Sequence, residues 1–191
     1  MHILTLQTFK YSQIPPPNME KVTLPKLTLR YEGIFDWDGL YAAIVDWAKM
    51  NSYKWVEKSF KHKVPSPEGA EEEIEWILET KATEYLKYSI NLTVHTWNMM
   101  DVDVDVNGKK KKLTSTKLYI ILEPTLSYDW QNRFQGSKLL KKLSYWYFNL
   151  SGGVNHWETL YYRTCNLHAM MKKYFDMQSK THHYKKYLGE N

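Results

Sequence analysis

Cys165 and His168 are the residues of this chain whose types and spacing come nearest to a catalytic pair. They are three positions apart in a segment with helical periodicity, so both side chains would lie on one face of a helix. A thiol beside an imidazole can act as a nucleophile. The sequence offers no group to orient the imidazole and none to stabilise an oxyanion, so we interpret Cys165 as a small apolar residue that packs.

Carboxylates gather in two places where they could bind a metal or support acid–base hydrolysis. Asp101, Asp103 and Asp105 would project from one face of a strand, which suits a hard cation such as Ca²⁺, but the lysines 109–112 follow directly. Residues 71–79 contain five glutamates, and Ile74, Trp76 and Leu78 alternate with Glu73, Glu75 and Glu79, as on a half-buried strand with one wet face. We interpret both clusters as solvated surfaces, the first of them salt-bridged.

Known catalytic motifs are absent from the chain. His156-Trp157-Glu158 lacks the second histidine that a metalloprotease needs, and His182-His183 lies in a polar end segment that we interpret as solvated. There is no GxGxxG, no P-loop and no GxSxG. We therefore predict a non-enzymatic protein with no catalytic residues, no metal site and no cofactor.

The C-terminal third carries the net charge of +5. Residues 131–191 hold ten Lys or Arg and three acids, a balance of +7, whereas residues 1–130 hold 16 basic and 18 acidic groups, a balance of −2. We predict a basic-aromatic interaction surface formed by Lys138, Lys141, Lys142, Tyr145, Arg163, Lys172, Lys173, Lys185 and Lys186. Such a surface suits an acidic protein, nucleic acid or an anionic membrane, and a merely solvated lysine face is the alternative.

Two helices are expected to carry this surface. Ser137 can cap the first, which has apolar positions Leu139, Leu140, Leu143, Trp146, Tyr147 and Leu150 and ends at Gly152-Gly153. Asn155 can cap the second, in which Trp157, Leu160, Tyr161, Leu167, Met171 and Phe175 form one stripe.

The preceding residues predict a sheet with one early helix. Residues 21–31 read as a strand whose alternation changes phase at Pro25, which indicates a bulge or an edge position. Asp36 or Asp38 can cap a helix that stops near Asn51. After this helix, segments of alternating apolar and polar residues, typical of β-strands, extend to residue 106.

Asn107-Gly108 is the strongest local signal, because both residues accept the positive φ of a type I′ hairpin turn. The turn would place Asp105 opposite Lys110 and Asp103 opposite Lys112. The run from residue 86 to 106 is too long for an ordinary strand, so we expect a bend near residues 97–100. A bulge there, or near residues 115–117, would bring Leu118, Ile120 and Leu122 onto the face of Val94.

These elements predict an α+β domain: an antiparallel β-sheet of about five or six strands, with one early helix and two C-terminal helices covering a face. Residues 1–18, which include three consecutive prolines, would form an extended arm, residues 19–178 the domain, and residues 179–191 a basic tail. The order of elements resembles helix-grip lipid-binding folds, which implies a small-ligand pocket between sheet and helices. It also resembles tube-forming proteins of viral tails.

Eight Trp, fifteen Tyr and six Phe favour burial of aromatic surface, within the chain or against a partner. The expected function is that of a structural or assembly protein, a subunit of a virion or other multi-subunit particle, whose protein partners are copies of itself or neighbouring subunits. The alternatives are a nucleic-acid-binding protein that uses the basic C-terminal helices, and a small-ligand-binding helix-grip-like domain. With one cysteine, no signal peptide and no membrane span, we expect a cytoplasmic or particle-associated location.

Overall fold

A six-stranded antiparallel sheet and three helices make up the protein, in agreement with the predicted α+β class. The computed structural model describes residues 21–66, 69–106, 109–134, 137–150 and 153–175, so the predicted arm and tail lie outside the described residues. The elements are β1 (Lys21–Thr23), β2 (Leu27–Phe35), α1 (Trp37–Met50), β3 (Lys54–Ser66), β4 (Gly69–Lys81), β5 (Leu86–Val106), β6 (Lys109–Tyr128), α2 (Lys138–Leu150) and α3 (Gly153–Tyr174).

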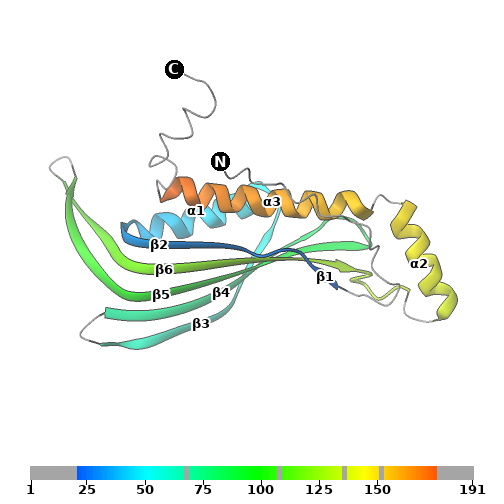
Figure 1. Ribbon diagram of the computed structural model, residues 1–191, viewed down its shortest axis with the longest axis horizontal. Coiled ribbons are helices and arrows are strands. Elements are labelled where there is room, and N and C mark those ends of the chain that lie inside the picture. Colours follow the sequence, from blue (N-terminus) through cyan, green and yellow to red (C-terminus); the bar gives the residue numbers. More distant parts are fainter. Residues whose placement is uncertain (1–20, 67–68, 107–108, 135–136, 151–152, 176–191) are drawn as a thin grey trace, which may run out of the picture.

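The sheet has the order β1-β6-β5-β4-β3, and β2 continues the β1 edge by pairing with β6 as well. Helices α1 and α3 lie on one face of the sheet, whereas α2 lies beyond one end of α3 and crosses its direction (Figure 1). We call the other face, over which Figure 1 draws no helix of the described part of the chain, the open face.

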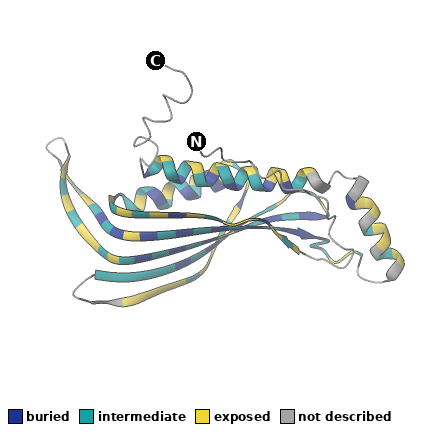
Figure 2. Cartoon of the chain, viewed as in Figure 1, coloured by how far each residue is buried: buried dark blue, intermediate teal, exposed yellow. Residues whose placement is uncertain are grey.

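Alternation along the strands decides which side chains form the core. Val94 lies opposite Ile120 in the β5–β6 ladder, and both are buried on the face that the helices cover. Leu118 and Leu122 share that face, which confirms the predicted register. Buried and less buried residues therefore alternate along the central strands (Figure 2), and the buried set of these strands includes Ile74, Trp76, Leu78, Leu86, Tyr88, Ile90, Leu92, Val94, Leu118, Ile120 and Leu122.

A bulge interrupts β5 where the sequence predicts a bend. Trp97 pairs with Lys117 and Met100 pairs with Ser115, so β5 holds one more residue than β6 between these two pairs. Asn98 within the bulge has a φ of 53°, a left-handed conformation that asparagine tolerates better than most residues.

The distal hairpin of β5 and β6 has the predicted register. Asp105 lies opposite Lys110, and Asp103 lies opposite Lys112. A 2.7 Å ion pair also joins Lys112 to Asp101, as expected of a salt-bridged hairpin. Asn107-Gly108 itself lies outside the described residues.

Local signals also place the start and end of α1. The Asp36 carboxylate accepts a 3.0 Å hydrogen bond from the Gly39 amide, and the helix ends at Asn51. Both boundaries were predicted. Leu40, Ile44, Trp47 and Ala48 then form its buried side.

Two other predicted boundaries differ from the structure. Residues 21–31 form not one strand but two, separated at 24–26, where β6 holds one residue fewer between Thr23–Thr125 and Leu27–Leu122; this is the bulge that the phase change at Pro25 predicts. Helix α3 starts at Gly153, two residues before the predicted cap Asn155, because Gly153 joins the first turn of this helix rather than ending α2.

Candidate interaction surfaces

One side of α2 is fixed against the end of the sheet. The Tyr85 hydroxyl lies 2.5 Å from Ser144 Oγ, and the Tyr85 ring meets the Tyr147 ring edge to face. Phe148 is buried, with its ring centroid 5.1 Å from that of Tyr128. Ser137 caps the helix as predicted, since Leu140 N donates to Ser137 Oγ over 3.2 Å. These contacts set the rotation of α2 about its axis.

That rotation directs three large apolar side chains into solvent. Leu139, Leu143 and Trp146 are 77%, 47% and 59% exposed, and their spacing of four and three residues places them along one line of the helix. We call these three residues the α2 stripe. The sequence correctly marks them as apolar, but they do not cover the core as the residues on the other side of α2 do.

The predicted basic residues that the structure describes do not come together in one patch. Lys142 on α2 is exposed, and α2 contains no acid; the side chains of Lys138, Lys141 and Tyr145 lie outside the described set. Lys172 and Lys173 belong to the last turn of α3. A helix rises 1.5 Å per residue, which separates them from the α2 end of α3 by about 30 Å. Lys185 and Lys186 lie outside the described residues.

Arg163 is half-buried and packs against two tyrosine rings. Its guanidinium lies 6.0 Å from the Tyr53 ring centroid and 5.7 Å from that of Tyr88. The Tyr53 hydroxyl is buried with no hydrogen-bond partner in the described part of the chain. Burial raises the pKa of Tyr53, and the neighbouring Arg163 guanidinium partly offsets this effect. Arg163 is therefore a packing residue between α3 and the sheet.

A second polar contact lies under α3 beside Arg163. The Tyr88 hydroxyl is 2.6 Å from His156 Nδ1. Burial raises the pKa of Tyr88 to about 12 and lowers the pKa of His156. Both groups are consequently neutral near pH 7, and the phenol donates to the imidazole.

Cys165 and His168 show no sign of nucleophile activation. Burial raises the pKa of the Cys165 thiol and so disfavours the thiolate. His168 Nε2 lies 3.1 Å from the Thr28 carbonyl oxygen, to which it donates, and burial lowers the pKa of this imidazole. His168 therefore links α3 to β2, and Cys165 is half-buried on α3.

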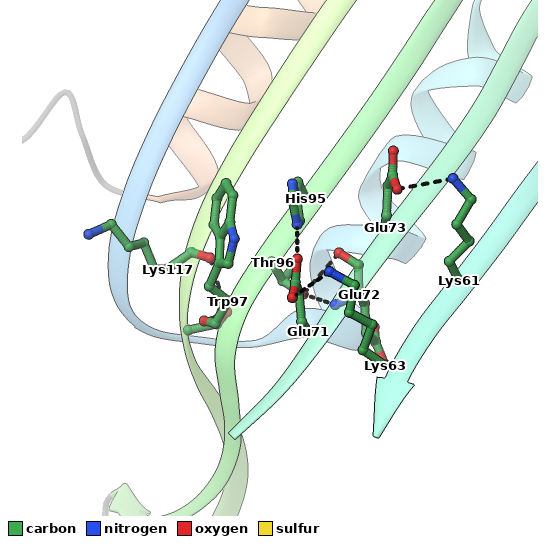
Figure 3. A network of polar contacts seen from close by, with 10 residues as sticks. Lys61, Lys63, Glu71, Glu72, Glu73, His95, Thr96, Trp97 and Lys117 are labelled. Atoms are coloured by element: carbon green, nitrogen blue, oxygen red, sulfur yellow. Dashed lines mark hydrogen bonds and ion pairs between the residues drawn. The ribbon is translucent and has the colours of Figure 1, made fainter. Parts of the chain in front are cut away.

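The glutamates of β4 are paired, mostly with lysines of β3. Glu73 binds Lys61, and Glu71 lies 2.9 Å from Lys63 and 2.7 Å from His95 Nε2 (Figure 3). Lys63 and His95 hold the pKa of Glu71 below its ordinary value. These carboxylates form the wet face that the alternation predicts.

Beside this network, the open face contains a groove of about 470 Å³. Its lining residues come from β2, β5 and β6: Arg30, Tyr31, Glu32, Trp97, Lys117, Leu118 and Tyr119. Arg30 stands 4.9 Å from the Tyr119 ring centroid, and the ring centroids of Trp97 and His95 are 3.9 Å apart with their planes tilted by 30°. Trp97 stands between His95 and Lys117 (Figure 3).

Sequence reasoning missed this groove because its members are distant along the chain. The pairing of Arg30 with Tyr119 and of Trp97 with Lys117 brings them together. The predicted strand register could have identified these residues if it had been applied to the side chains that point away from the helices as well as to the core.

Metal ligands and membrane-spanning helices were sought among the described residues. This part of the chain contains no group of three His, Cys, Asp or Glu side chains that could hold a metal ion. It also contains no helix long and apolar enough to cross a membrane. No protein-family model and no curated protein matches the sequence.

Proposed function

We propose that this chain is a non-enzymatic structural protein that assembles with neighbouring copies of itself through α2. The observation that carries the proposal is the α2 stripe, whose large apolar side chains face solvent while the opposite side of the helix is fixed. Trp is among the residue types that contribute most to binding at protein interfaces, and a line of anchors four and three residues apart suits insertion of a helix into a groove.

The charge of the chain favours contact between unlike parts of two copies. Helix α2 carries three lysines and no acid, within a C-terminal third of net charge +7, whereas residues 1–130 carry −2. Two α2 helices would repel one another, but α2 and the earlier part of another copy would not. Such a heterologous contact repeats from copy to copy and builds rings or filaments, as in a multi-subunit particle.

Extension of the sheet is a poorer route to assembly. The edge strand β3 carries lysines Lys54, Lys58, Lys61 and Lys63 and has a register shift between Glu57 and Ser59. Lysines and bulges on an edge strand oppose pairing with a strand of another molecule. The helix side of the molecule is therefore the better candidate for contacts between copies.

The test is size-exclusion chromatography with light scattering over a range of protein concentrations, at low and moderate salt. We expect a mass above 22.9 kDa that increases with concentration. The variant Leu139→Ser/Leu143→Ser/Trp146→Ser should be a monomer, whereas the control Tyr162→Ser, at a 68% exposed site on α3, should behave as the wild type.

A wild-type protein that stays monomeric throughout contradicts the proposal. So does self-association that the triple variant leaves unchanged. An acid-free helix with lysines, leucines and tryptophan also suits an anionic lipid surface. Flotation of a monomeric wild type with phosphatidylglycerol vesicles, lost in the triple variant, would assign α2 to lipid instead of to another copy.

A further inference from the structure

We infer that the open face of the sheet binds single-stranded nucleic acid, with bases on the rings of Trp97 and Tyr119 and phosphates on Arg30 and Lys117. The site is separate from α2. It also differs from the basic C-terminal helices at which the sequence places nucleic acid. Its ligand and its test are independent of the proposed assembly.

The rings lie on neighbouring strands of the sheet. Trp97 is on β5 and Tyr119 on β6, one diagonal step apart, because Trp97 pairs with Lys117 and Tyr119 is two residues beyond Lys117. Diagonal neighbours on one face are about 7–8 Å apart, which suits two successive bases of an extended strand. One face of Trp97 lies against the His95 ring, and Lys117 stands on its other side (Figure 3). Lys117 and Tyr119 line the groove together with Trp97.

The charges beside these rings suit phosphate groups. Arg30 is exposed and stands over Tyr119, so it can contact a phosphate while it supports a stacked base. Within the described part of the chain, Lys117 forms a 3.5 Å ion pair with Glu32, and both side chains are well exposed. Ion pairs of this kind contribute little, so Lys117 is available to a phosphate at small cost.

The neighbouring acids do not prevent this binding. Glu71 and Glu73 occupy the next strand, but Lys63, His95 and Lys61 pair with them. The electrostatic repulsion that a strand of phosphates would meet on this side of the groove is correspondingly reduced.

The shape of the site favours a single strand over other anionic ligands. An antiparallel sheet with helices behind it and aromatic rings on its open face is a known platform for unstacked bases. Stacking on rings does not depend on sequence, because each base has a flat face. A duplex offers no unstacked base to Trp97, and the open groove does not enclose a free nucleotide.

The experiment is fluorescence anisotropy of labelled oligothymidylate and oligouridylate with the full chain, repeated over a range of salt concentrations. We expect binding that weakens with salt. Loss of one stacked base corresponds to about 1–3 kcal/mol, so Trp97→Ala should weaken binding by roughly tenfold or more, and Trp97→Phe should restore most of it. Arg30→Glu/Lys117→Glu should weaken binding further and reduce the salt slope by about 2.

The matched control is Lys172→Glu/Lys173→Glu, which changes the same number of charges at the far end of α3. The inference is overturned if the wild type binds the oligonucleotide, the Arg30→Glu/Lys117→Glu variant still binds it, and the Lys172→Glu/Lys173→Glu control does not. So does a wild type that binds no single strand, or that binds a duplex or uridine monophosphate as tightly. Circular dichroism of each variant shows whether the fold is retained, and the Trp97→Phe variant keeps the test decisive if Trp97→Ala unfolds.

Discussion

Replacement of Arg163 tests whether this residue supports the core or only adds surface charge. Arg163→Ala removes two contacts between a guanidinium and a tyrosine ring, each of about 0.5–1 kcal/mol at a partly exposed site. It also removes an aliphatic stem that covers apolar surface, which adds about 1 kcal/mol. The expected loss in the free energy of unfolding is about 2–3 kcal/mol, or a fall of about 4–12 °C in Tm for a chain of this length.

The assay is urea denaturation followed by tryptophan fluorescence. Arg163→Lys should keep part of the stability, because an ammonium also lies favourably over aromatic rings but lacks the planar stacking of a guanidinium. Lys173→Ala is the control, since this exposed residue should change the free energy of unfolding by less than about 0.5 kcal/mol. If Arg163→Ala costs no more than Lys173→Ala, Arg163 does not pack in solution as described.

Two further predictions concern pH and backbone conformation. Burial lowers the pKa of His156 below its ordinary 6.5, so the unfolded chain binds more protons than the folded chain as the pH falls through that value. The free energy of unfolding should therefore decline below about pH 6.5. His156→Gln should flatten this dependence on pH, measured by urea denaturation between about pH 8 and pH 5. An unchanged slope would contradict the buried, neutral imidazole. Gly69 has a φ of +119°, and a Cβ there would lie 2.6 Å from the carbonyl carbon of Asn98, so Gly69→Ala should cost about 1–3 kcal/mol by calorimetry, and a neutral effect would refute this crowding.

Features set by neighbouring residues could be predicted from the sequence. The register of the distal hairpin follows from the two residues of its turn, and the start of α1 follows from the carboxylate of Asp36. The bulge near Trp97 was predictable because, without it, the hairpin register would turn Leu118, Ile120 and Leu122 away from the face of Val94.

The surfaces were harder to predict, because they depend on contacts between distant residues. Helix α2 has more apolar positions than one side can bury, and the contacts of Tyr85 and Phe148 turn Trp146 toward solvent. Arg163 looks like any other basic residue of a helix until Tyr53 and Tyr88 are brought beneath it.

The single extra residue of β5 at the bulge decides which face of the sheet each later side chain of this strand points to. Even-numbered side chains of β5 face the helices up to Thr96, whereas beyond the bulge Asp101, Asp103 and Asp105 take that direction. Deleting either Asn98 or Met99 would exchange the two sides of β5 beyond the bulge, so that valines replaced aspartates on the side of the helices, while β6 kept its two sides. Changes in length at the tip of the hairpin would leave both sides as they are, so this ribbon should tolerate insertion at its end and resist a one-residue deletion at its base.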